Sequence, residues 1–372
     1  MNKLLYTFFL GYMLLYGGNL LSQRKVADSP PGNGLVDASS LQSGREEYST
    51  PAQKVEENTT LIYGEIINPD SLSPLSLKII PYYISPRTTF LQEELMLSPV
   101  KGEFYDGVMN PRTKKFETQI LLSDRPGYLS LFLGNRPLLE DYLVLPGDSI
   151  KLKLDLSRNA IIFAGKNQDF YEAQFALKRL DQQREFDSPR QLIIPETSSL
   201  LTRTGSQEKI DYFRGRFGAE LLILKPGKES LHYLIGQADQ AVDILKPKLE
   251  ILDFYQPKLS PKNWDLLRAE VYGNFYYSIL STFRKFPYPY VEHKFSAKDR
   301  EHYRQRLTDL LTQLRNLEFD SQSKLISAAF LDLELERLIL NALWENRSFL
   351  ELVQENHSGE LADRLQAAYL SN

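Results

Sequence analysis

The side chains that most often carry chemistry in proteins are either missing from this sequence or spaced in ways that build no familiar site. The chain contains no cysteine, which excludes thiolate metal ligands, cysteine nucleophiles, disulfides and dithiol redox motifs within its 372 residues. Two imidazoles three or four residues apart on a helix could bind a metal ion, but no histidine pair has that spacing. We therefore expect surface or partly packed histidines and no metal site. The four histidines are His232, His293, His302 and His357.

Carboxylates alternate with leucines near the end of the chain, at Asp332, Glu334 and Glu336. Two carboxylates can serve as general acid and general base when their surroundings move their pKa values apart, which spacing alone does not reveal. We interpret these residues as a solvated helix face in which Glu334 pairs with Arg337. The sequence also lacks a GxSxG motif, and its SxxK motif has no suitable companion. It thus predicts no catalytic residue and no enzyme activity for this chain alone.

Composition and charge narrow the class of protein further. Lys and Arg number 44 and Asp and Glu number 48, so the formal net charge is −4. This balance argues against a nucleic-acid partner, because such binding depends on clustered basic side chains that neutralise phosphates. A chain of 372 residues can bury a sizeable core and is long enough for two domains.

The first 22 residues have the pattern of a signal peptide. Lys3 provides the positive start, and the apolar run over 4–16 is shorter than a membrane-spanning helix requires. Cleavage after Ser22 would leave Gln23 as the first residue, so we expect a periplasmic or otherwise exported protein that does not span the membrane once the signal is removed. An uncleaved anchor extending to Leu21 is the alternative. A lipoprotein is excluded, because its lipid is attached to a cysteine.

The residues from 23 to 60 are polar and contain few large apolar side chains, so we expect a disordered linker. The segment 61–165 then has the pattern of an antiparallel β-sandwich. Its clearest strand has Ile150, Leu152 and Leu154 alternating with lysines after a Pro-Gly-Asp turn, and a second short strand ends before Gly165. No glycine-rich phosphate loop follows any of these strands, so no nucleotide cofactor is predicted.

From 166 to 372 the apolar spacing changes to threes and fours, which predicts an irregular α-helical bundle; a helical solenoid is a minor alternative. The expected helices begin at Asn167, at Ser260-Pro261 and at Ser296, and another runs through Leu331 and Leu338. Between them we expect a loop around Pro189 and Pro195, and then a helix through Ile210 that ends near Pro226-Gly227. The predicted fold class is therefore α+β, with a β-sandwich followed by a helical bundle.

The stretch YGNFYYSILSTFRKFPYPY, over 272–290, is the most unusual in composition. Aromatic rings with polar tips are favoured on surfaces that bind proteins or peptides. Helical spacing already directs Val271, Phe275 and Ile279 inward, so we favour the alternative in which half of these rings pack inside the bundle and PYPY is a rigid connector. The stretch nevertheless supplies the candidate partner-binding residues, which are Tyr276, Tyr277, Phe286, Tyr288 and Tyr290.

The segment LVLPGDSIKLKLD followed by IIFAGKNQDFYEAQFALKR resembles the N-terminal region of Bacteroidetes-type TlpA-like periplasmic thioredoxin-family proteins. In that family a PGD turn, an amphipathic strand and a short F-x-G step precede a helical region and then a catalytic thioredoxin domain. LIYGEIINP resembles the first strand of the same region. The resemblance covers roughly 60–370, and it implies an exported accessory module with a protein or peptide partner, for which a thioredoxin-like protein is one candidate.

The chain departs from that family in one decisive respect. The reductase works through a WCxxC motif, and no position of this sequence matches it, so no activity is carried over to any residue here. We expect a non-catalytic binding module. The alternative is the N-terminal part of a split or truncated thiol-disulfide oxidoreductase whose catalytic domain lies outside this chain. A WCxxC motif in the translated DNA beyond Asn372 would favour the alternative.

Overall fold

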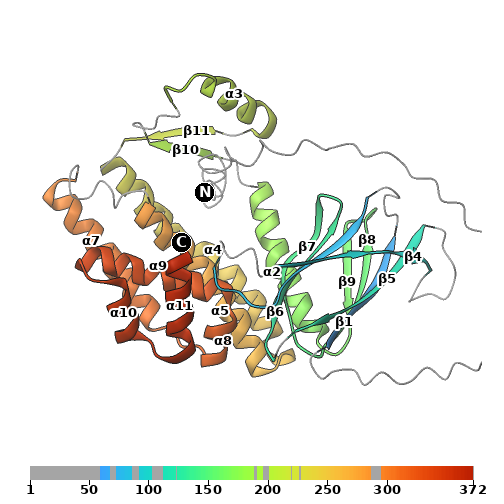
Figure 1. Cartoon of the computed structure of the whole chain (residues 1–372). Helices are drawn as coiled ribbons and strands as arrows, with labels where there is room; N and C mark the ends of the chain where they lie inside the picture. Colours follow the sequence, from blue (N-terminus) through green and yellow to red (C-terminus); the bar gives the residue numbers. More distant parts are fainter. Residues whose placement is uncertain are drawn as a thin grey trace, which may run out of the picture.

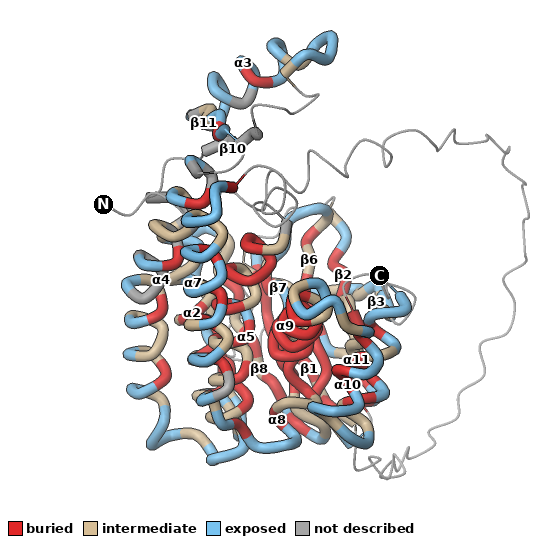
Figure 2. Tube along the Cα trace, turned by 90° about the vertical axis from the view of Figure 1, so that its left-hand side faces the viewer, coloured by how far each residue is buried: buried red, intermediate tan, exposed pale blue. Residues whose placement is uncertain are grey.

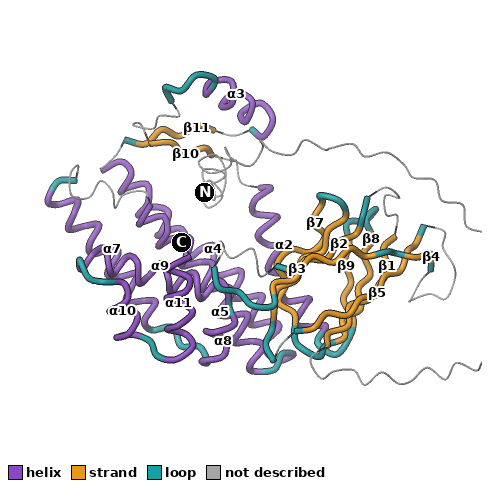
Figure 3. The backbone as a smooth tube through the Cα atoms, in the orientation of Figure 1, coloured by secondary structure: helices purple, strands orange, loops and turns teal. Residues whose placement is uncertain are grey.

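The structure is a computed structural model in which a β-sandwich packs against a layer of helices (Figure 1). It describes residues 59–67, 73–85, 92–102, 112–122, 124–187, 191–195, 201–218, 220–225, 228–285 and 295–371. Most strands lie in the first half of the described chain and most helices in the second (Figure 3). The predicted α+β class is therefore confirmed. The predicted signal peptide and linker lie almost entirely outside the described residues.

Two sheets form the sandwich. One has five strands in the order β4-β5-β1-β8-β9 and the other has four in the order β3-β2-β6-β7. Alternating apolar side chains such as Ile62, Phe116 and Leu152 face inward and are buried, as expected for strands with one wet face. The strands are β1 (Thr59–Ile67), β2 (Leu75–Ile80), β3 (Glu93–Leu97), β4 (Val100–Lys101), β5 (Thr113–Leu121), β6 (Gly127–Leu133), β7 (Arg136–Val144), β8 (Ser149–Asp155) and β9 (Ala160–Ala164).

One strand pair differs from the predicted antiparallel sandwich. β1 and β8 run parallel in the centre of the five-stranded sheet, with Leu61 opposite Ser149 and Ile67 opposite Asp155. Parallel strands need a long crossover connection, and here the chain between them supplies β2, β6 and β7 to the other sheet. Local sequence patterns show that a strand exists but not which distant strand it pairs with.

The helices occupy the rest of the described chain. Ser296 begins α7 as predicted, because its hydroxyl accepts a hydrogen bond from the backbone N–H of Asp299 at 3.1 Å. Ser260 likewise accepts from the N–H of Asn263 at 3.2 Å where α5 begins. The helices are α2 (Gln168–Asp187), α3 (Ser206–Phe217), α4 (Lys228–Tyr255), α5 (Pro261–Lys285), α7 (Ala297–Arg315), α8 (Ser321–Ile326), α9 (Ala328–Glu345), α10 (Phe349–Asn356) and α11 (Gly359–Ser371), with a 3₁₀ turn η3 (Gln256–Lys258).

Two predictions for the helical part were wrong, and one helix was missed. The expected loop contains the strand β10 (Gln191–Pro195), which pairs in parallel with β11 (Glu220–Leu224). A five-residue apolar run without alternation does not reveal its structure by periodicity, so this pairing was missed. The helix expected to end near Pro226 ends at Phe217, because Gly218 adopts the left-handed conformation (φ 62°) and donates its N–H to the carbonyl of Arg214. Finally, α4 was not predicted, and it continues through Pro247.

The main apolar core extends from the sandwich into the helices, and smaller clusters lie beside it. Leu152 and Phe163 of the sandwich belong to the same buried cluster as Phe170 of α2 and Leu280 of α5. Figure 2 shows α9 deeply buried between its neighbours, whereas α3 and much of α4 are exposed. The predicted domain boundary after residue 165 stays a prediction, and the continuous core ties the two parts together. No helix in the described part of the chain is both long and apolar enough to cross a membrane.

Candidate functional site

Ionisable side chains are concentrated where the four-stranded sheet meets α5 and α9. We call the residues Tyr83, Tyr128, Glu270, Ser327 and Asp332 the junction cluster. They come from the segment after β2, from β6, from α5, from the N-cap of α9 and from α9 itself. Tyr128 and Ser327 are hydrogen-bonded to Glu270, and Tyr83 is hydrogen-bonded to Asp332. The Tyr83 and Tyr128 rings, with centroids 6.2 Å apart, bring the two groups together. Apart from Ser327 and Asp332, these residues come from segments that are far apart in the sequence. The fold alone therefore assembles this group.

A close approach of two helices places Glu270 in the cluster. Gly273 of α5 lies against the backbone of Ala329 in the first turn of α9, where a β-carbon would come within 2.4 Å of the Ala329 carbonyl carbon. Only glycine permits that distance. Glu270 lies one turn earlier on α5, so its carboxylate reaches the N-terminus of α9. Helix N-termini favour negative charge because their backbone N–H groups lack partners within the helix.

Glu270 joins the sandwich to α9 through one carboxylate oxygen. Its Oε1 accepts from the Tyr128 hydroxyl at 2.5 Å and from the Ser327 hydroxyl at 2.7 Å. The Tyr128 oxygen in turn accepts from the backbone N–H of Ala328 at 2.7 Å. Burial, together with the Glu270 charge, raises the pKa of Tyr128 well above its usual value, so the phenol stays protonated. The group therefore caps α9 and fastens β6 to it.

Asp332 makes the second connection. The Tyr83 hydroxyl donates to Asp332 Oδ1 at 2.9 Å and to Oδ2 at 2.8 Å. Burial raises the pKa of Asp332 to about 7; the Tyr83 bond opposes this rise, and the charges of Glu270 and Glu336 add to it. Glu336 itself is paired, because Arg284 of α5 donates to both of its carboxylate oxygens. Asp332 is thus a carboxyl group whose proton is exchangeable near neutral pH.

A different environment surrounds Glu334, two residues further along α9. Arg337 donates to both of its carboxylate oxygens, and the His357 ring lies 2.6 Å away. Burial alone would raise the pKa of Glu334, but the bonds from Arg337 and His357 outweigh it and lower the pKa to about 2. The predicted Glu334–Arg337 pair is confirmed. The predicted solvated face is wrong, since only 6% of Glu334 and 3% of Glu336 is exposed.

The prediction of a solvated face failed because helix periodicity does not show how many sides of a helix other elements cover. α9 packs on α5 on one side and on α10 and α11 on the other. Polar side chains on both sides are therefore enclosed, and each needs a partner. Asp332 and Glu334 have pKa values moved in opposite directions, as in an acid–base pair. Residues two apart on a helix point about 200° away from each other, however, so the two carboxylates do not share a reaction site.

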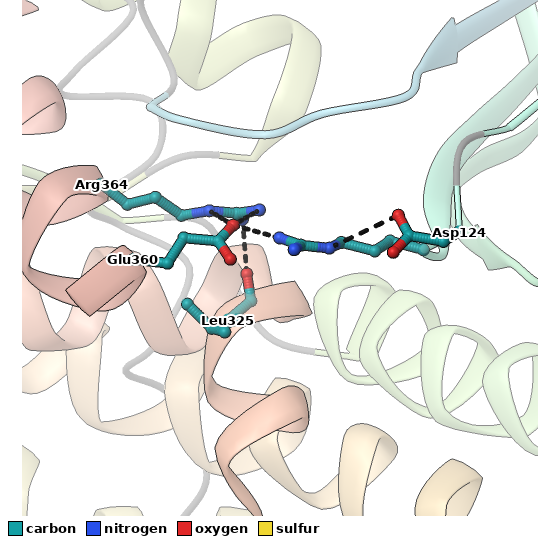
Figure 4. A network of polar contacts seen from close by, with 5 residues as sticks. Asp124, Leu325, Glu360 and Arg364 are labelled. Carbon is teal, nitrogen blue, oxygen red and sulfur yellow. Dashed lines mark hydrogen bonds and ion pairs between the residues drawn. The ribbon is translucent and has the colours of Figure 1, made fainter.

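A third group of charges joins the sandwich to the C-terminal helices (Figure 4). Arg125, in the turn before β6, pairs with Glu360 at the start of α11. Glu360 also accepts from Arg364, whose guanidinium donates to the Leu325 carbonyl at 2.5 Å. The same guanidinium lies 4.0 Å from the ring centroid of Tyr82. Arg364 is therefore satisfied by a carboxylate, a carbonyl and an aromatic face at once.

Lys178 of α2 is another side chain near the junction whose pKa is shifted. Its ammonium nitrogen lies 5.3 Å from the ring centroid of Tyr142 in β7. Burial lowers the pKa of Lys178, and the nearby charges of Asp141, Glu270 and others oppose that effect. A lysine in such surroundings is held by packing as much as by charge.

The structure separates the candidate partner-binding residues. Tyr276 is 9% exposed and stacks on Tyr272 with ring centroids 6.3 Å apart, and burial raises its pKa. Tyr277 is half-buried and packs against the main core. Phe286, Tyr288 and Tyr290 lie outside the described residues. The first two rings therefore contribute to packing, and a role of the stretch in partner binding stays a prediction.

The histidines are likewise dispersed. His232 and His302 are exposed, His357 is half-buried against Glu334, and His293 lies outside the described residues. Within the described ranges, no three histidine or carboxylate side chains come together as a metal site requires. Sequence reasoning singled out Asp332 but not the cluster to which it belongs, because the bonds that join the cluster link residues far apart in the sequence. Tyr83 follows an apolar strand and Glu270 lies in a helical stripe, so neither residue carries a local signal.

Comparisons with known proteins give no further information on the site. No protein-family model matches this chain, and no curated protein matches its sequence. The geometry must therefore carry the functional argument by itself. Its main property is that each carboxylate of the junction cluster is engaged by a donor from another segment, so these groups join the sandwich to the helices.

Proposed function

We propose that this chain is an exported, non-catalytic accessory module of the TlpA-like kind, which recognises a protein or peptide partner in the cell envelope. The observation that carries the proposal is the junction cluster. Tyr83 and Tyr128 of the sandwich are hydrogen-bonded to Asp332 and Glu270 of the helices. These ionisable groups therefore join the sandwich to the helices. A rigid two-part surface of this kind suits binding, because little conformational freedom is lost when a partner docks.

The order of the elements also supports this proposal. A sandwich that ends in a PGD turn, an amphipathic strand and a helical region is what the family resemblance implies. In this chain β8 and β9 lead directly into α2, and Asp148 of the turn accepts from the Tyr171 hydroxyl of α2 at 2.6 Å. That bond joins the turn before β8 to the first helix of the helical region. The accessory role and the location in the cell envelope remain part of the proposal.

Binding of an unfolded polypeptide to the purified chain from Gln23 onward tests the proposal. A reduced and carboxymethylated protein without stable structure is a suitable probe, and biolayer interferometry measures its capture. We expect saturable binding that weakens when Tyr288 and Tyr290 are both changed to Ser, with Tm nearly unchanged. Changing the exposed Tyr212 and Tyr369 to Ser provides the matched control, which should bind normally.

Two results would contradict the proposal. Equal capture by all variants at reduced Tm would show that Tyr288 and Tyr290 contribute to stability and not to binding. Reduction of insulin disulfides by the pure chain would show catalysis, which the absence of cysteine argues against.

A further inference from the structure

The segment 81–85 is the part of the sandwich that reaches furthest over the helices (Figure 1). Tyr83 bonds to Asp332 of α9, and the Ser85 hydroxyl lies 2.9 Å from that of Ser371 at the end of α11. Tyr82 stacks on Arg364 of the same helix. Three side chains of this segment thus contact α9 or α11, and the Tyr83–Asp332 bonds are the central contact.

The charges around Asp332 are mostly negative. Glu270 faces it from α5, and Glu336 faces it from the next turn of α9. Tyr277 of α5 lies near the Tyr83 hydroxyl. Arg284 of α5 donates to both carboxylate oxygens of Glu336. Among the described residues no lysine or arginine forms an ion pair with Asp332, so its ionised form is held only by a neutral phenol.

We propose that Asp332 is a pH-sensitive contact between the sandwich and the helices, which holds segment 81–85 tightly when protonated and loosens it when ionised. A protonated carboxyl adds no charge beside Glu270 and Glu336 and still bonds to Tyr83. Ionisation adds a third negative charge beside Glu270 and Glu336 in a half-buried contact, where hydration of that charge favours opening. The proposal concerns the junction and does not depend on any partner.

The direction of the pH effect follows from linkage. Burial raises the pKa of Asp332 from an ordinary value of 3.8 to about 7 in the folded chain. A carboxyl with a raised folded pKa contributes most to stability below its unfolded pKa, and that contribution is lost as pH rises through the folded pKa. The contact is therefore strongest in acid, below the ordinary pKa of 3.8, weakens as the pH rises toward about 7 and is weakest above neutral pH.

Amide hydrogen exchange of the whole chain tests this inference. After correction for the intrinsic pH dependence of exchange, we expect protection over 81–85 to fall about tenfold between about pH 5.5 and about pH 8.5. Asp332→Asn should remove that pH dependence, because the amide stays neutral. Glu351→Gln, on the exposed face of α10, is the matched control and should behave as the unmodified chain does.

A second measurement keeps the inference testable if the Asn variant fails to fold. The carboxyl carbon of Asp332 can be titrated by NMR in the unmodified protein, and we expect a midpoint near neutral pH. A midpoint below about pH 5, close to that of a free carboxyl group, would overturn the proposal. Equal loss of protection in the unmodified chain and in Asp332→Asn would overturn it as well.

Discussion

Gly273 of α5 lies in direct contact with Ala329 of α9, and the space between them is too small for any other side chain. A β-carbon at position 273 would come within 2.5 Å of the Phe330 backbone nitrogen as well as of the Ala329 carbonyl. This close approach places Glu270 at the N-terminus of α9, where it accepts from the Ser327 hydroxyl. Glu270 also accepts from Tyr128 of β6, so the sandwich is attached at the same point. The position of one glycine thus decides where the junction cluster forms.

Gly273→Ala should destabilise the protein despite the better helix propensity of alanine. The added methyl group meets backbone atoms, which cannot rotate away, so we expect a loss of about 1–3 kcal/mol of unfolding free energy in urea. Gly215→Ala is the matched control, because nothing lies within 4 Å of a β-carbon there. That helical substitution should be neutral or stabilise by about 0.5–1 kcal/mol. Similar behaviour of both variants would show that α5 and α9 can move apart.

Tyr128→Phe should weaken the link between β6 and α9. The change removes a hydrogen bond to the Glu270 carboxylate and leaves the Ala328 N–H without its acceptor, so we expect a loss of about 2–3 kcal/mol. Urea unfolding at neutral pH measures it. Tyr369→Phe should cost little, because this exposed ring contributes mainly by stacking on Phe349. A loss of less than about 0.5 kcal/mol at position 128 would mean that water replaces both bonds.

Glu334 should stabilise the protein only when it is ionised. Its folded pKa of about 2 lies below the ordinary 4.5, so its contribution is present above that value and is lost as pH falls toward 2. We expect Glu334→Gln to reduce stability at neutral pH by up to roughly 3 kcal/mol, and the difference from the unmodified chain to shrink on acidification. Urea unfolding at a series of pH values checks this. A difference that grows in acid would contradict the assignment.

The two arginines that contact Glu360 should differ in their effect. Arg364 is 5% exposed and donates to the Leu325 carbonyl, so Arg364→Met leaves buried groups without a donor and should cost about 2–3 kcal/mol. Arg125 contacts the same carboxylate from a more exposed position, and a pair of that kind is worth about 0–1 kcal/mol. Thermal unfolding of Arg125→Met and Arg364→Met compares them. Equal losses would show that the turn before β6 depends on its ion pair.

The sequence by itself determined the local features of this protein. Alternation around Leu152 predicted β8, and the three-and-four spacing after Asn167 predicted α2, because each pattern reflects which side chains face water within one element. Ser296 and Ser260 correctly marked two helix starts, since a cap bonds to a backbone N–H only a few residues away. The α+β class followed from these local patterns.

Tertiary structure decided the rest. The parallel pairing of β1 with β8, the pair β10–β11 and the burial of Glu334 and Glu336 all depend on segments that meet only after folding. The same holds for Tyr83 and Asp332, which are 249 positions apart. The sequence around neither residue predicts their contact. The pKa of a carboxyl group depends on its burial and its neighbours in space, so only the folded chain sets that of Asp332.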